Sequence, residues 1–294
     1  MALDQEEVET VEKKGEKEMS FFDHLEALRW HIIRSLVAII LFGIVIFANK
    51  DFVFRQVIYA PRYDDFLTYR VFCYLGDWLC FKPAPFTIIT RDLAEKFTMH
   101  ITVSFVLGII AAFPYVFWEF WRFIKPGLYP KEQKAARGIV LVCSLLFLSG
   151  VLFGYYMIAP FAMTFLAGYE LADTLSTPTL GSYVNYLVMF TMPIGLVFEM
   201  PIVSFFLTKL GILTPSLLKK VRRYAIIVIL IVAGILTPSP DMVSQLILAT
   251  PLYMLYEASI LVSSREMKRK KREAAKEEAE LLERERRIES TNRD

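Results

Sequence analysis

Acidic residues inside apolar segments are the side chains of this sequence best suited to chemistry. Glu199 lies near the middle of the apolar run 183–207, two residues before Pro201, and Glu257 lies in the run 242–262. A carboxylate inside a bilayer is costly and persists where it faces a cavity or a partner. Pro201 has no backbone N–H, so a kink is expected beside Glu199. The sequence predicts a polar intramembrane groove at Glu199, with a structural hydrogen bond as the alternative; Glu257 better fits an interfacial position.

A second candidate site follows the apolar run 97–121. The stretch WEFWRFIKPGLYPKE, residues 118–132, is dense in aromatic side chains and places Glu132 just past a rigid turn at Pro126 and Gly127. An exposed acid beside an apolar surface suits a basic, partly apolar peptide. An aromatic belt at the lipid headgroups is the alternative explanation for these rings.

Motifs of common enzymes are absent from the sequence. It contains no P-loop glycine pattern, HExxH, GxSxG or CxxC, and His24, His31 and His100 are scattered. We therefore expect no enzyme activity, no cofactor and no metal. Cys73 and Cys80 have six residues between them and are as consistent with a local disulfide as with two free thiols.

Composition indicates a membrane protein. Hydrophobic residues make up 55% of the chain, the mean hydropathy is +0.43, and only 22% of residues are charged. The charges gather in the polar stretches 1–19 and 264–294, which leaves too few to solvate the region between them. We predict a disordered N-terminal tail (1–19), one membrane domain (20–263) and a charged C-terminal tail (264–294). A nucleic-acid binder with a broad basic surface is excluded.

Six apolar runs can position the candidate residues. They cover residues 30–48, 97–121, 138–159, 183–207, 224–236 and 242–262. The fifth would form roughly 20 Å of helix, against a hydrocarbon core of about 30 Å, so it should thin the bilayer locally or lie recessed. The sequence predicts an all-α, polytopic protein with six transmembrane helices. A re-entrant hairpin formed by the last two runs is the alternative.

The distribution of basic residues predicts the orientation. They cluster in the connections after the second and fourth runs and are missing after the third and fifth, which places both termini in the cytoplasm. The run KRKKR at 268–272 is expected to anchor the last span against anionic lipid. The chain shows no internal repeat of the kind found in inverted-repeat transporters.

Six short motifs, in this order, resemble those of the TatC family, the signal-receptor subunits of the twin-arginine protein translocase. The motifs are FFDHLEALR at 21–29, YAP at 59–61, WRFIKPGLYPKE at 121–132, FEMP at 198–201, LTPSPDMVSQ at 236–245 and PLYMLYE at 251–257. The resemblance extends over nearly all of 20–263. It implies a concave bundle of six helices whose fifth and sixth spans are short.

The resemblance also implies a function in a prokaryotic inner membrane. A protein of this family would bind the twin-arginine signal peptides of folded precursors and export them with the proton motive force. Its partners would be TatA-like and TatB-like single-span subunits and further copies of itself. Carried over by position, Phe123 and Glu132 match signal-binding residues, Glu199 the intramembrane acid, Asp241 an acid of the last outer turn, and Pro61 a proline of the first loop.

One position departs from the family pattern. Relatives commonly read HLxELR, but here Ala27 replaces the acid and Glu26 precedes it. A shift of one residue turns a helical side chain by about 100°. Glu119, four residues before Phe123 and on the same helix face, is a candidate to replace the missing carboxylate. An i,i+3 pair between Glu119 and Arg122 is the alternative.

Paired carboxylates would explain selectivity for paired arginines. A carboxylate can hold a guanidinium group through two hydrogen bonds, which the single ammonium of lysine reproduces poorly. The apolar part of a signal would then lie along a groove lined by the second to fourth spans. A proton-coupled secondary transporter with Glu199 as its carrier site is the alternative function.

Overall fold

The described part of the chain is helical. The computed structural model describes residues 21–76, 80–83, 86–124, 136–168, 177–236 and 242–291. Within these ranges the only β-type pairing is an isolated bridge between Ile89 and Thr179. The prediction of an all-α protein is confirmed.

Among the described residues, four stretches of helix are long and apolar enough to cross a membrane: Leu25–Ala48, Glu95–Ile124, Gly138–Gly168 and Leu180–Lys209. The helical elements are α1 (Phe21–Ala48), α2 (Lys50–Phe52), the π-helix η1 (Val53–Ile58), the 3₁₀-helix η2 (Ala60–Arg62), α3 (Leu67–Leu75), α4 (Glu95–Ile124), α6 (Ala136–Phe153), the π-helix η4 (Gly154–Ile158), α7 (Ala159–Gly168), α8 (Leu180–Val197), α9 (Met200–Lys209), α10 (Pro215–Leu236) and α11 (Met242–Thr291).

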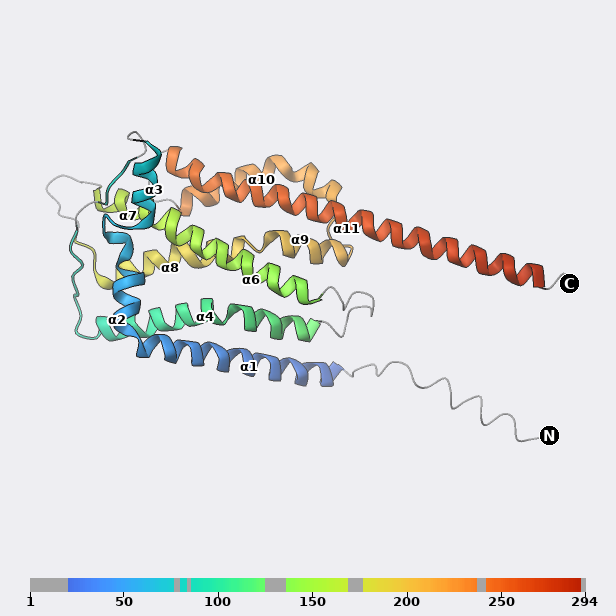
Figure 1. Ribbon diagram of the computed structural model, residues 1–294, viewed down its shortest axis with the longest axis horizontal. Helices are drawn as coiled ribbons and strands as arrows, with labels where there is room; N and C mark the ends of the chain where they lie inside the picture. The colour runs from blue at the N-terminus through green and yellow to red at the C-terminus, as the bar shows by residue number, and fades with distance from the viewer. Residues whose placement is uncertain are drawn as a thin grey trace.

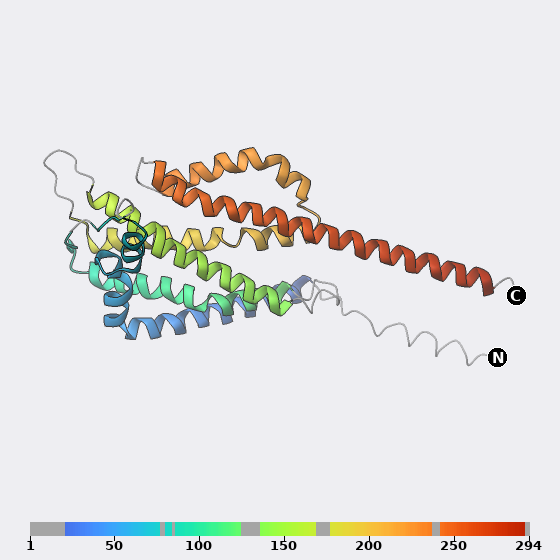
Figure 2. The same ribbon diagram turned by 45° about the horizontal axis from the view of Figure 1, so that its top comes forward.

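The long helices run along one common direction (Figure 1). α1 packs along α4, α6 lies between α4 and α8, and α9, α10 and α11 form the other side of the bundle. The start of α1 and the end of α11 lie at the same end of the molecule, and α2, α3 and α7 lie at the opposite end (Figures 1 and 2). This arrangement agrees with the predicted placement of both termini on one side of a membrane.

α10 begins well before the apolar run that predicted it. The basic residues at 219–223 were expected in a connector, but they form the first half of a helix of 22 residues, about 33 Å long. The Tyr256 hydroxyl of α11 donates to the Leu218 carbonyl oxygen at 2.7 Å and so ties this half of α10 in place. The helix therefore has the length of a span, although only its second half is apolar.

α11 passes through the predicted boundary between membrane domain and tail without a break. It has 50 residues, about 75 Å of helix, and its last part extends beyond the rest of the bundle (Figure 1). The described part of the charged tail is thus a continuation of the last apolar helix.

Glycine lets α6 and η4 approach α8 closely. A Cβ atom added at Gly154 would collide with the backbone carbonyl oxygen of Phe190, and one added at Gly195 would lie 2.8 Å from the Val151 side chain. Small residues at such contacts allow dispersion attraction between helices, which drives helix packing where the surrounding solvent is itself apolar. Phe190 and Ile194 are buried at this contact.

The end of the bundle opposite to the termini is closed by η1, η2 and α3. The Tyr69 hydroxyl donates to the Pro61 carbonyl oxygen at 2.9 Å, and Cys73 in the last turn of α3 forms a disulfide with Cys80. Burial raises the pKa of Tyr69 above its usual value of 10.0, so the hydroxyl keeps its proton and remains a donor at neutral pH. Pro61 is itself fully buried, which gives the predicted first-loop proline a structural position.

Candidate functional site

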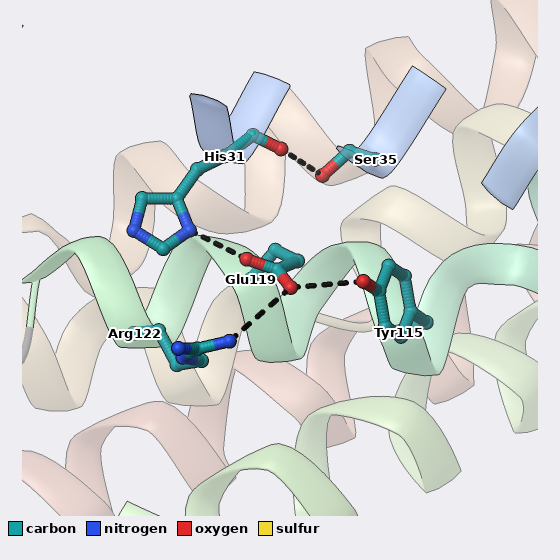
Figure 3. A network of polar contacts seen from close by, with 5 residues as sticks. All are labelled: His31, Ser35, Tyr115, Glu119 and Arg122. Atoms are coloured by element: carbon teal, nitrogen blue, oxygen red, sulfur yellow. Dashed lines mark hydrogen bonds and ion pairs between the residues drawn. The ribbon is translucent and has the colours of Figure 1, made fainter. Parts of the chain in front are cut away.

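A buried acid joins α1 to α4. Glu119 is 1% exposed, and its Oε2 lies 2.5 Å from Nδ1 of His31 on α1 (Figure 3). Its Oε1 accepts a hydrogen bond from the Tyr115 hydroxyl at 2.9 Å and lies 3.5 Å from Nη1 of Arg122. Both carboxylate oxygens are therefore engaged, as a desolvated charge requires.

Helical spacing brings these groups together. Tyr115 and Arg122 are four residues before and three residues after Glu119, so all three lie on one face of α4. α1 supplies His31, whose carbonyl oxygen accepts a hydrogen bond from the Ser35 hydroxyl at 2.9 Å. The i,i+3 pair of Glu119 with Arg122 that the sequence suggested is present, and the role of Glu119 in arginine recognition stays a prediction.

Phe123 lies at the same junction. Its ring is partly buried and meets the His31 ring at a centroid distance of 6.1 Å and an interplanar angle of 64°. The Arg122 guanidinium lies over the Trp118 ring at 4.9 Å. The network around Glu119 therefore orients the end of α4, immediately before the segment that carries Glu132.

The other predicted signal-binding acids are placed differently. Glu26 is exposed on the first turns of α1, and Ala27 is partly buried beside it. Glu132 and Asp241 lie outside the described residues. The structure thus brings Phe123 and Glu119 together near the end of α4, and the start of α1, which carries Glu26, lies at the same end of the molecule (Figure 1).

An apolar surface continues from this junction along α1. A shallow cavity of about 510 Å³ is lined by Trp30, Ile33, Arg34, Val37, Ala38, Leu41, Phe42 and Tyr115. Tyr115 therefore links the Glu119 network to the cavity. Large apolar side chains of α1 are exposed here, for example Trp30 at 55% and Leu41 at 58%.

Glu199 lies at a break in the fourth apolar stretch. α8 ends at Val197 and α9 begins at Met200, with Pro201 in its first turn, so the helix is interrupted beside Glu199, where a kink was predicted. The side chain is 9% exposed, and neither carboxylate oxygen has a hydrogen-bond partner among the described residues. The Cys143 thiol and the Phe147 backbone of α6 are its polar neighbours. Both alternatives for Glu199, a polar groove and a hydrogen bond to another helix, therefore stay predictions, and α6 supplies the candidate partners for the second.

A separate cavity lies between the second, third and fourth apolar stretches. It measures about 290 Å³ and is lined mainly by aliphatic side chains of α4, α6 and α8, together with Tyr155 and Tyr156 of η4. Glu199 is not among its lining residues. This cavity lies among the spans where an apolar groove was predicted, but the buried acid does not line it, and the groove itself stays a prediction.

Glu257 has partners on two helices. The Arg222 guanidinium of α10 holds it in two contacts of 2.9 Å, Nε to Oε1 and Nη2 to Oε2, and the Tyr253 hydroxyl donates to Oε1 at 2.8 Å. Its side chain is partly exposed. This geometry agrees with an interfacial acid that fastens α10 to α11.

His31 is the residue at this site that sequence reasoning missed. Sequence reasoning regarded the histidines as scattered, because His31 and Glu119 are 88 positions apart and no local spacing links them. The available signal was indirect: a buried acid at 119 requires a donor, and α1 is the neighbouring apolar helix.

These features define a multi-pass helical membrane protein with a buried polar network and an exposed apolar surface at one end of the bundle. A model of the family "Sec-independent protein translocase protein (TatC)" matches residues 23–251. The chain is 35% identical over 259 residues to the Sec-independent protein translocase protein TatC of Blattabacterium sp. subsp. Periplaneta americana (strain BPLAN), an alignment covering 85% of this chain and 97% of that relative.

Other relatives agree. The chain is 31% identical over 249 residues to the Sec-independent protein translocase protein TatCy of Bacillus subtilis (strain 168), covering 84% of this chain and 89% of that relative. The crystal structure of a twin arginine translocase receptor, TatC, superposes with a TM-score of 0.63 at 31% identity, covering 83% of this chain and 99% of that one. The chain therefore belongs to the TatC family of Sec-independent protein translocase proteins.

Proposed function

We propose that this protein is the receptor and core subunit of a twin-arginine translocase in a prokaryotic inner membrane. It binds the paired arginines of signal peptides through carboxylates near the start of α1 and the end of α4. The apolar part of the signal lies on the exposed apolar surface of α1 beside them. TatA-like and TatB-like single-span subunits and further copies of the chain complete the translocase, which uses the proton motive force.

The α1–α4 junction carries this proposal. It combines the exposed acid Glu26, the aromatic ring of Phe123, which packs against His31, and an apolar cavity of about 510 Å³ at one end of the bundle. A signal peptide has the complementary chemistry of two guanidinium groups followed by an apolar segment. The segment that carries Glu132 begins at the same place, one residue after Ile124 ends α4.

Glu199 supports a role in a step after recognition. Its carboxylate is buried at the α8–α9 break without a hydrogen-bond partner among the described residues. A buried acid of this kind is available to a polar group of an incoming partner.

A proton-coupled solute transporter is the second candidate, and the break between α8 and α9 beside a buried acid favours it. The two functions differ in what the protein binds. Capture of a twin-arginine peptide, with no capture of a twin-lysine peptide, is expected of the receptor and not of the transporter.

Glu132→Lys tests the receptor function directly. We expect this variant to insert normally and lose signal binding, because a charge-assisted contact is worth roughly 1.5 to 3 kcal/mol and the new cation repels arginine. Glu280→Lys, on the exposed distal part of α11, is the control with the same charge change. Signal crosslinking at the parental level in Glu132→Lys would overturn the assignment.

A further inference from the structure

A further cavity lies just past the end of α1 and beside the start of α4, at the end opposite to Glu119. It measures about 670 Å³ and is lined by residues of α2, η1, η2, the segment 86–90, α4 and the start of α8. Lys50, Arg62, Lys96 and His100 are among the lining residues, against one acid, Asp51. Lys96 is 23 positions before Glu119 on α4, about 35 Å along the helix, so the two sites are separate.

The cations of this cavity are available to a ligand. Lys50 and Lys96 are exposed, and Arg62 is partly buried with its guanidinium 5.9 Å from the Phe86 ring centroid. Among the described residues, none of these three cations has a carboxylate within ion-pair distance. Three positive charges around one cavity therefore favour an anion.

The cavity lies at the level where both helices change from apolar to polar. The apolar run of α1 ends at Ala48, two residues before Lys50, and that of α4 begins at Phe97, one residue after Lys96. His100 fixes the two helices here, because its ring stacks on Phe47 at 3.9 Å and its Nε2 donates to the Phe47 carbonyl oxygen at 3.1 Å. This level corresponds to the headgroup layer of a bilayer.

An exposed apolar row leads from the cavity toward the centre of the bundle. Phe97 lines the cavity, and Ile101 and Phe105 follow at i,i+4 spacing on the same face of α4. These side chains are 62%, 47% and 52% exposed, respectively. A ligand with an anionic head and an apolar chain would fit both the cavity and the row.

We propose that this cavity binds the phosphate headgroup of an anionic phospholipid, whose acyl chain lies along Phe97, Ile101 and Phe105. Lys50, Arg62 and Lys96 surround the phosphodiester. The site lies at the other end of the molecule from the KRKKR cluster on α11, and it does not depend on signal recognition. A free phosphate ion offers the same charge and is distinguished by experiment.

The triple variant Lys50→Gln, Arg62→Gln, Lys96→Gln tests the site. For the purified full-length chain in lipid nanodiscs, native mass spectrometry should show retention of phosphatidylglycerol over phosphatidylcholine. Each removed cation should weaken that preference about fivefold. The control Arg55→Gln, Arg70→Gln, Lys82→Gln removes the same charge from exposed positions that do not line the cavity, and its preference should remain parental. Equal loss in both triple variants would overturn the proposal.

Two further measurements use the unaltered chain. A photoactivatable phosphatidylglycerol should crosslink to peptides that contain Lys50 or Phe97, and crosslinks confined to the KRKKR region would contradict the site. Phosphatidylglycerol should also raise the melting temperature, whereas inorganic phosphate alone should not. Equal stabilisation by phosphate would overturn the assignment to a lipid.

Discussion

Two roles are considered for the Glu119 carboxylate, one in stabilising the helix contact and one in binding a signal peptide. As a partner of His31, Tyr115 and Arg122 it stabilises the contact between α1 and α4, and as a substitute for the acid missing at Ala27 it would also contribute to arginine binding. Glu119→Gln keeps the size of the side chain and removes its charge. We expect a loss of roughly 1.5 to 3 kcal/mol in stability, measured by thermal unfolding of the purified protein, because a charge-assisted buried contact is weakened.

The binding role is measured by signal-peptide affinity in a double-mutant cycle. If Glu119 compensates for Ala27, Glu119→Gln weakens binding and the additional Ala27→Glu change restores it. Unchanged affinity in the single variant would leave the carboxylate with its structural role alone. Glu280→Gln, on the exposed tail of α11, provides the control for a change in net charge.

Glu199 is expected to act after signal binding. Glu199→Ala should leave initial signal crosslinking intact and slow transport, because the side chain is buried at the α8–α9 break and cannot meet a peptide at the end of the bundle. The measurement is export of a folded precursor by membranes that contain equal amounts of variant and parental protein. Transport at the parental rate would make Glu199 structural, and loss of inserted protein would assign it to packing.

Single residues show where sequence reasoning succeeds. Glu199 and Pro201 could be predicted because the signals are local: an acid inside an apolar run and a proline two positions later. His31 could not, because its importance depends on a contact across 88 positions. Glu257 was predicted at the membrane interface, which stays a prediction, and its bidentate contact with Arg222 depends on how α10 and α11 align.

At the scale of elements, glycine contacts between neighbouring helices are the most specific feature. A Cβ atom at Gly154 would meet the Phe190 carbonyl oxygen, which belongs to helix backbone and cannot turn aside. We expect Gly154→Ala to destabilise the protein by about 1 to 3 kcal/mol, as overpacking does, with a lower melting temperature of the purified chain. Gly138→Ala, in the preceding helix α6 and with no atom within 4 Å of the added carbon, should be neutral or slightly stabilising. Equal melting temperatures for the two variants would contradict the close contact.

Helix bounds show a limit of local reasoning. The apolar runs predicted the position of all the long helices, but the start of α10 was placed too late. The basic residues at 219–223 were assigned to the connection before the helix, because Lys and Arg are unfavourable inside a bilayer. Both residue types are nevertheless good helix formers. Contacts with α11 through Leu218 and Arg222 hold this half in place, and such contacts are not visible in a hydropathy pattern.

At the scale of the whole molecule, the two ends of the bundle should be accessible from opposite sides of a membrane. Leu93 is exposed and lies two residues before the start of α4, at the end that carries α2 and α3, and Glu280 lies on the distal part of α11. Each is replaced by cysteine in turn. In intact cells a membrane-impermeant maleimide is expected to label Leu93→Cys, and to label Glu280→Cys only after permeabilisation. Labelling of both in intact cells would contradict the predicted orientation.

The natural cysteines provide an internal control for this experiment. Cys143 is buried, and Cys73 and Cys80 are joined in a disulfide, so the parental chain should not react. Reductant should expose Cys73 and Cys80 to the reagent in intact cells, since disulfides persist in an oxidising compartment. Equal labelling with and without reductant would leave these residues as free thiols.

The uninterrupted course of α11 has a mechanical consequence. Residues 264–291 continue the last apolar helix without a proline and reach about 42 Å past it, so the span and the described tail move as one lever. A tilt of about 10° within the bilayer would displace the far end by about 7 Å. A spectroscopic label near Glu285 would therefore magnify small movements of the span into distances that are easily resolved.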